Sequence, residues 1–117
     1  MTDLDRRLPI IVKACDDKLA FNIKVLNISE LTSIGDYFVI ASGNSTTQVA
    51  AISDAVEEKM DKAGFKLLQK EGYNSSKWVL MDYGDIIVHI FRKEEREFYK
   101  LERLWSDGVE LDINLLM

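Results

Sequence analysis

The sequence predicts an α+β, two-layer fold in which a single mixed β-sheet is flanked by helices. Stretches with apolar residues at helical spacing alternate along the chain with short apolar runs of the length of strands. Two of these runs are separated by a tight Tyr-Gly turn, which is typical of a β-hairpin. The chain has 117 residues, 47% of them apolar, enough for one hydrophobic core. We therefore expect one domain over residues 1–117, with the element order α-β-β-α-β-β-β-α.

A helix and two strands are expected in the first third of the chain. The run Ile23 to Ile28 is predicted to be a strand, and the run Tyr37 to Ser42 is apolar on both faces, as in a central strand. The helix is predicted over Leu4 to Leu19, because apolar side chains recur there at helical spacing. These side chains are Leu8, Ile11, Val12, Cys15 and Leu19.

A second helix has clear signals at both ends. Ser45 can cap its N-terminus, and Gln48 three residues later completes a capping box. Gly64 is the expected stop. The predicted buried stripe consists of Val49, Ile52, Val56, Met60 and Ala63.

The second half is expected to supply the hairpin. A short strand over Phe65 to Gln69 precedes an exposed turn over Glu71 to Lys77. Strands over Trp78 to Asp82 and Ile86 to Phe91 then flank the turn, where Gly84 takes the position that requires a positive φ.

A last helix and an extended tail complete the prediction. The helix begins near Glu94, where acidic side chains favour a helix N-terminus. The tail from Val109 to Leu115 alternates apolar and polar residues, which predicts an extended segment packed on the domain or on a partner. The predicted buried face of the helix consists of Phe98, Leu101, Leu104 and Trp105.

Composition narrows the classes of function. The N-terminus lacks a secretory signal, and the longest apolar runs are far too short to span a bilayer. The single cysteine, Cys15, suits a reducing cytosol. We therefore expect a cytoplasmic protein without membrane contact. The net charge of −5 disfavours sequence-specific nucleic-acid binding and favours a basic protein surface as the partner.

His89 is the only histidine and the first candidate for chemistry. It shares a strand face with Ile87 and Phe91, so we expect a packed side chain with one hydrogen bond satisfied. One histidine and one distant cysteine do not form a zinc pattern. We expect no metal and no cofactor.

A nucleotidyltransferase-like site is the second candidate. Such enzymes have a Gly-Ser step at a helix N-terminus and an Asp-x-Asp pair on a neighbouring strand. Here Asn44 separates Gly43 from Ser45, and Asp82 and Asp85 lie three apart across a turn, which does not suit a metal clamp. We therefore expect that the protein is not an enzyme.

A partner-binding surface is the third candidate. Trp78, Leu80 and Asp82 project to one side of their strand, and Val79 and Met81 to the other. One interpretation is that Trp78 covers the core and the acids solvate the turn. The other is that an aromatic anchor ringed by carboxylates binds a basic protein.

Three longer stretches of the chain carry a resemblance to a known family. "SIGDYFVIASGNS", "EGYNSSKWVLMDYGDIIVHIF" and "REFYKLERLW" resemble the Iojap family of ribosomal silencing factors, from about Pro9 to Trp105. The resemblance implies a nucleotidyltransferase-like fold without its catalytic residues. It also implies binding to the large ribosomal subunit, which blocks joining of the small subunit and represses translation.

The resemblance further implies a partner and a site. The partner is ribosomal protein fourteen of the large subunit (uL-fourteen in systematic naming). Two other functions stay open, namely a large-subunit assembly factor and a nucleotide-binding protein, and an exposed sheet edge with an apolar tail allows a homodimer. The family's contact residues, carried over to this chain, are Trp78, Leu80, Met81, Asp82, Tyr83, Asp85 and, more weakly, Glu71.

Overall fold

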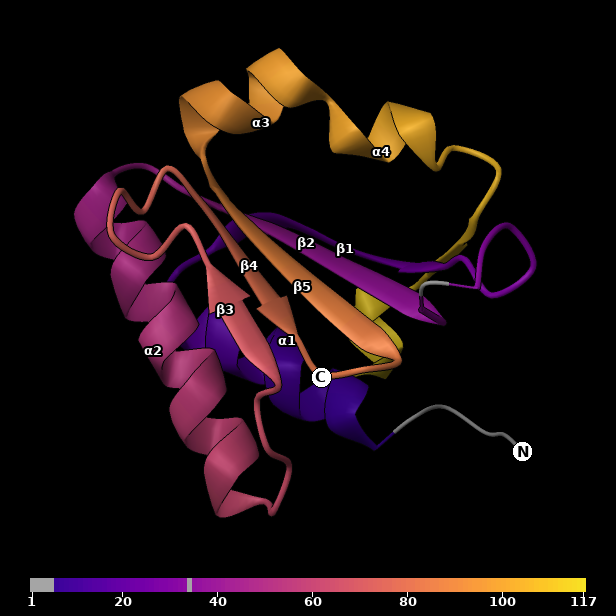
Figure 1. Ribbon diagram of the computed structural model, residues 1–117, viewed down its shortest axis with the longest axis horizontal. Coiled ribbons are helices and arrows are strands. Elements are labelled where there is room, and N and C mark those ends of the chain that lie inside the picture. The colour runs from indigo at the N-terminus through magenta and orange to yellow at the C-terminus, as the bar shows by residue number, and fades with distance from the viewer. Residues whose placement is uncertain (1–5, 34) are drawn as a thin grey trace.

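The computed structural model describes residues 6–33 and 35–117, and it places one mixed sheet between helices (Figure 1). The helices α1 and α2 cover one face of the sheet, and the short helices α3 and α4 lie over the other. The predicted helix start at Leu4 lies outside the described residues. In chain order the elements are α1 (Arg7–Asp17), β1 (Phe21–Asn27), β2 (Tyr37–Gly43), α2 (Thr46–Lys62), β3 (Gln69–Glu71), β4 (Trp78–Asp82), β5 (Ile86–Arg92), α3 (Lys93–Tyr99), α4 (Leu101–Leu104), β6 (Val109–Leu111) and a 3₁₀ turn, η1 (Ile113–Leu115).

The sheet has the strand order β3-β4-β5-β2-β1-β6. The central strands β2 and β5 run parallel, while the other described pairs are antiparallel. Parallel pairing needs a crossover, and the segment that contains α2 provides it. The predicted mixed sheet is confirmed, with β6 as an additional edge strand. Because β2 is central and covered on both sides, six of its seven residues are buried, as expected for "YFVIAS".

The main core lies between the sheet and the α1–α2 layer. Five residues were predicted to form the buried face of the first helix, and the prediction is wrong for Leu19. This side chain is 79% exposed, because α1 ends at Asp17 and the chain turns away. The other four are confirmed. The side chains from α1 and α2 that fill this core include Leu8, Ile11, Val12, Cys15, Val49, Ile52, Val56 and Met60.

The capping signals of α2 are confirmed with one change. The Ser45 Oγ accepts from the Gln48 backbone N–H at 3.1 Å, as predicted. In return, the side-chain oxygen of Gln48 accepts from the backbone N–H of Asn44 at 2.7 Å, one residue before the cap.

The longest described helix is α2. No helix in the described part of the chain is long and apolar enough to cross a membrane.

The hairpin β4–β5 is confirmed, but the strand before it is displaced. Gly84 has φ +92°, and Asp82 Oδ1 accepts from its backbone N–H at 2.7 Å. The short strand lies at Gln69–Glu71 and not at Phe65 to Gln69, because Phe65 packs against the main core from the connection. Gly72 then leads the chain away at φ +82°, where any Cβ would overlap the Trp78 carbonyl oxygen.

The last helix differs most from its prediction. Lys100 takes a left-handed conformation (φ 49°, ψ 49°) and divides the segment into α3 and α4. The predicted buried positions Phe98 and Leu104 are therefore wrong, with 77% and 76% of their surfaces exposed. Leu101 is buried and Trp105 is partly buried against the second face of the sheet. This segment adds a partial third layer to the expected two.

The tail is extended over only part of the predicted length. Val109–Leu111 pairs with β1 as an edge strand, and the chain then turns into the 3₁₀ turn η1. Leu115 is 79% exposed, whereas Leu116 is buried in the main core. The alternation therefore ends after one short strand.

Candidate functional site

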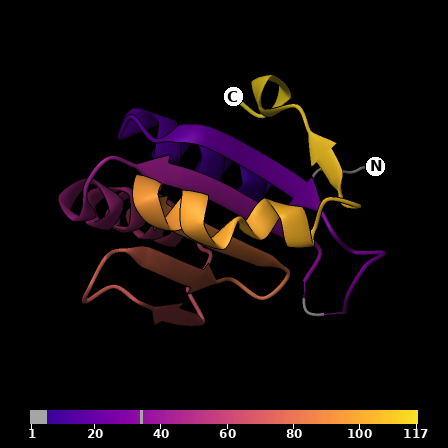
Figure 2. The ribbon, with the colours of Figure 1, turned by 90° about the horizontal axis from the view of Figure 1, so that it is seen from above.

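The second face of the sheet is only partly covered. The α3–α4 segment runs over β2, and the β3–β4 side of the sheet is left open (Figure 2). At the boundary lies a shallow groove of about 440 Å³. The groove is lined by Phe38, Leu80, Asp82, Ile87, His89, Leu101, Leu104 and Trp105.

Trp78 lies beside this groove at the start of β4 and is partly buried. Its ring stacks on Phe91 with 4.8 Å between ring centroids, and it also contacts Tyr99 at 4.9 Å. Its indole N–H donates to His89 Nδ1 at 3.1 Å. Trp78 therefore holds the α3 layer to the sheet in addition to presenting an edge at the surface.

His89 is the packed residue that the sequence predicted. It is 4% exposed, and its Nδ1 accepts from Trp78. An accepting Nδ1 places the ring proton on Nε2, which has no partner within the described residues. Burial lowers the pKa of His89 to about 4, so the ring is neutral at pH 7. His89 therefore lines the groove as a neutral, packed ring.

We expect the ring protons of His89 to titrate with a midpoint near pH 4, instead of the usual 6.5, in a ¹H NMR titration. Between pH 6.5 and 4 the unfolded chain takes up a proton that the folded ring does not, so the free energy of unfolding must fall as the pH falls. The assignment is unambiguous because the chain has one histidine. A midpoint above pH 6 would show that the ring is solvated.

Leu80 is the central apolar residue of the open surface. It pairs with His89 on one side and with Glu71, on the edge strand β3, on the other. Directly paired residues share a face of the sheet, so Glu71 stands next to Leu80. Asp82 lines the groove two residues further along β4, with one carboxylate oxygen held by its own turn. An apolar centre with acidic neighbours results.

Three of the predicted contact residues lie elsewhere. Met81 is fully buried and Tyr83 is 5% exposed, both in the core against the α1–α2 layer. Side chains alternate along a strand, so Met81 faces away from Trp78 and Leu80. Asp85 lies beyond the turn, with its carboxylate 3.6 Å from Arg7 of α1. The structure brings together Trp78, Leu80, Asp82 and Glu71, but not these three.

Several residues of the groove are not among the predicted contact residues. Leu104 and Trp105 were expected to form a buried helix face, yet Leu104 is 76% exposed at the groove. Phe38 and Ile87 lie on neighbouring strands, at positions paired with each other. The only available signal was the alternation within β5, which places Ile87 and His89 on the same face.

The nucleotidyltransferase-like arrangement is not assembled. Gly43 pairs with Arg92 at one end of β5, whereas Asp82 pairs with Ile87 at the other end. The candidate phosphate and metal residues are therefore separated by most of the length of β5. Among the residues that the structure describes, no group of three His, Cys, Asp or Glu side chains is arranged to hold a metal ion.

Known sequences similar to this chain belong to one family. Residues 2–116 match the family described as "ribosomal silencing factor during starvation". A ribosomal silencing factor of Bacillus subtilis is 41% identical over 110 residues, which cover 94% of this chain and 93% of the relative. The chloroplastic protein Iojap of Zea mays is 31% identical and matches 88% of this chain through 45% of its own length.

Solved structures agree with this comparison. A crystal structure from Chromobacterium violaceum is similar with a TM-score of 0.86 and 32% identity, covering 90% of this chain and 88% of the other. One from Bacillus halodurans has a TM-score of 0.80 and 38% identity, covering 90% and 95%. Because the family match spans nearly the whole sequence and the fold agrees with these relatives, the chain belongs to the ribosomal silencing factor family.

Proposed function

We propose that this chain binds the large ribosomal subunit and blocks its association with the small subunit, which represses translation by steric occlusion. The proposed contact is ribosomal protein fourteen of the large subunit, and the proposed place of action is the cytoplasm. Membership in a family named for ribosomal silencing supports a ribosomal partner. Occlusion needs no catalysis, because a surface buried by one protein is not available to another.

The observation that carries this proposal is the groove beside the open β3–β4 edge. Leu80 supplies an apolar centre, while Asp82 and Glu71 supply negative charge around it. A protein surface with an apolar side chain among lysines and arginines is complementary to this arrangement. An interface of standard size buries roughly 800 Å² on each partner, so it would extend well beyond the groove.

Co-sedimentation with isolated subunits tests the partner. We expect the chain to pellet with large subunits and not with small subunits, and to be released as the salt concentration rises, because Asp82 and Glu71 would face cations. Equal pelleting with both subunits would contradict the proposal. Binding to large subunits that is insensitive to salt would leave the partner in place but contradict the electrostatic contact.

A subunit-joining experiment tests the occlusion. Large subunits incubated with excess chain are mixed with small subunits, and the joined particles are separated on a sucrose gradient. We expect fewer joined particles than in a reaction without the chain. If joined particles form at the usual level and carry the chain, then the bound chain does not cover the subunit interface.

A further inference from the structure

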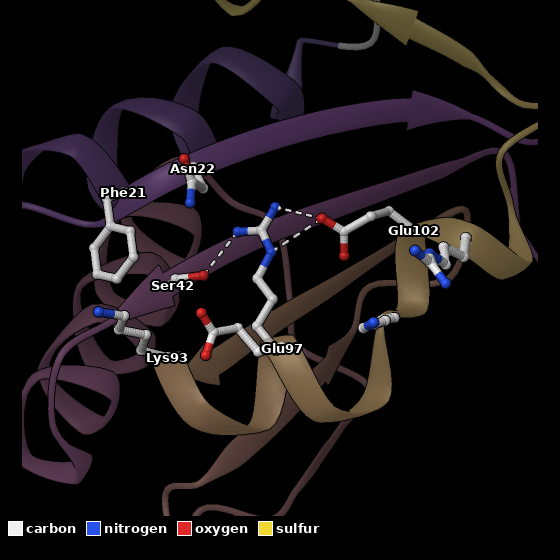
Figure 3. A pocket seen from close by; sticks show the side chains of 9 residues that line it. Phe21, Asn22, Ser42, Lys93, Glu97 and Glu102 are labelled. Carbon is white, nitrogen blue, oxygen red and sulfur yellow. Dashed lines mark hydrogen bonds and ion pairs between the residues drawn. The ribbon is translucent and has the colours of Figure 1, made fainter.

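A second cavity lies on the other side of the α3–α4 segment from the groove. It has a volume of about 340 Å³ and lies between the start of β1, the end of β2 and the α3–α4 segment (Figure 3). Phe21 and Asn22 contribute from β1, and Ser42 from β2. None of its lining residues lines the groove. The cavity is therefore separate from the proposed ribosome-binding surface.

Positive charge predominates in this cavity, although the chain as a whole carries −5. Four of its lining residues are cationic: Lys93, Arg96, Lys100 and Arg103. The two lining carboxylates are Glu97 and Glu102, and Arg96 pairs with Glu102. Within the described residues, the exposed side chains of Lys93, Lys100 and Arg103 form no ion pair. Besides Glu102, only Glu97 among the lining residues is acidic. Such an excess favours an anion, and phosphate suits lysine and arginine.

Arg96 gives the cavity a fixed wall. It is 7% exposed, and its guanidinium donates to Ser42 Oγ at 2.7 Å and to Glu102 Oε2 at 3.0 and 3.2 Å. Burial of the Glu102 carboxyl acts to raise its pKa, but the hydrogen bonds and charge of Arg96 outweigh burial and lower that pKa. Glu102 is therefore ionised at pH 7 and can only accept hydrogen bonds.

Glu102 keeps one oxygen without a partner. Its Oε1 atom is buried and receives no hydrogen bond from the described residues, while Oε2 is held by Arg96. A buried carboxylate oxygen is stabilised when a hydroxyl or amino group donates to it. Phe21, partly buried, adds an aromatic ring to the same cavity. A ligand that suits this wall has a hydrogen-bond donor and a flat ring.

Two non-glycine residues with positive φ lie on opposite sides of the cavity. Asn22 has φ 51° and Lys100 has φ 49°, two of the four non-glycine residues with positive φ in the described chain. Glycine would adopt this conformation without strain, but it would not supply the charge of Lys100. Strained non-glycine residues are common where a ligand is held.

We propose that this cavity binds a nucleoside phosphate. Lys100 and Arg103, from the same segment as Glu102, hold the phosphate, and a ribose hydroxyl or base amino group donates to Glu102 Oε1. The base packs on Phe21, which lies beside Lys93 at the other end of the cavity (Figure 3). The proposal does not depend on the ribosomal partner, because the groove and the cavity share no lining residue.

Two-dimensional ¹H–¹⁵N NMR of the full chain tests the proposal, with ADP, GDP, adenosine and inorganic phosphate as probes. We expect ADP or GDP to shift the backbone amides of Asn22, Ser42 and Lys100 and to bind at least about tenfold more tightly than phosphate or adenosine, which each satisfy only part of the site. No binding of either nucleotide at about 1 mM would overturn the proposal. Shifts confined to another surface, or equal affinity for phosphate, would also overturn it.

A double variant tests the residues. Lys100→Gly with Arg103→Gln removes two exposed cations and relaxes a strained φ, so the fold is expected to persist. We expect nucleotide affinity to fall at least about tenfold, whereas Lys66→Gln, an exposed lysine that does not line the cavity, changes it little. Unchanged affinity in the double variant would contradict the site. If a short single-stranded RNA competes with ADP and binds more tightly, the proposed ligand is wrong and RNA, not a free nucleotide, occupies the cavity.

Discussion

Leu80→Arg is expected to weaken binding to the large ribosomal subunit strongly and to leave the fold intact. The longer side chain would fill the groove and bring positive charge to a surface proposed to face lysines and arginines. The new guanidinium can pair with Glu71 on the adjacent strand, so no charge is buried without a partner. We expect a loss of at least about 2 kcal/mol, roughly thirtyfold in affinity, measured by titration of labelled chain with large subunits.

Leu19→Arg is the matched control for this experiment. Leu19 is 79% exposed and lies after α1, away from the groove, and the substitution is the same. Thermal unfolding of both variants checks that the fold persists. If Leu80→Arg binds as tightly as Leu19→Arg, the groove is not the interface. Trp78→Ala is less diagnostic, because its loss would also remove the contacts with Phe91 and His89 that support the fold.

Arg96→Met is expected to destabilise the protein by about 3 kcal/mol, because it leaves a buried hydroxyl and a partly buried carboxylate without their partner. Methionine keeps most of the apolar stem but removes the guanidinium. Ser42 Oγ, nearly fully buried on β2, would lose its donor, and Glu102 would lose its partner. Urea unfolding followed by circular dichroism measures the change, and an unaltered slope of the transition would show that two-state unfolding is kept.

Arg92→Met is the matched control for Arg96→Met. Arg92 is more exposed than Arg96 and forms two short hydrogen bonds, at 2.7 and 2.8 Å, with Glu95 only three residues away. Because solvent screens such a pair, its loss is expected to be much smaller. A similar effect of the two substitutions would mean that Arg96 contributes no more than a surface pair, and that it does not join α3 to the sheet.

The parts of the fold that were predicted correctly depend on neighbours in the sequence. The capping box at Ser45 and Gln48 spans three residues, and the turn at Gly84 depends on one positive φ and the Asp82 carboxylate. The packed state of His89 followed from the period of two along one strand. Such patterns act over a few residues, so they can be recognised without tertiary information.

The break at Lys100 could not be predicted in this way. The residues around it have helical spacing and few signals of a helix end. The Arg96–Ser42 hydrogen bond joins residues 54 positions apart, and Leu101 packs against a sheet face made by distant strands. These contacts favour two short helices over one continuous helix, and they leave Phe98 and Leu104 exposed.

The candidate site shows the same difference between local sequence patterns and tertiary contacts. Sequence patterns are enough to predict which side chains of β4 share a face, the acidic turn beside them and the resemblance to ribosomal silencing factors. The packing of distant elements buries Met81 and Tyr83, makes α4 one wall of the groove and pairs Glu102 with Arg96 in the wall of a second cavity. Side-chain alternation is a local property of the backbone, whereas burial and charge pairing depend on which distant elements pack together.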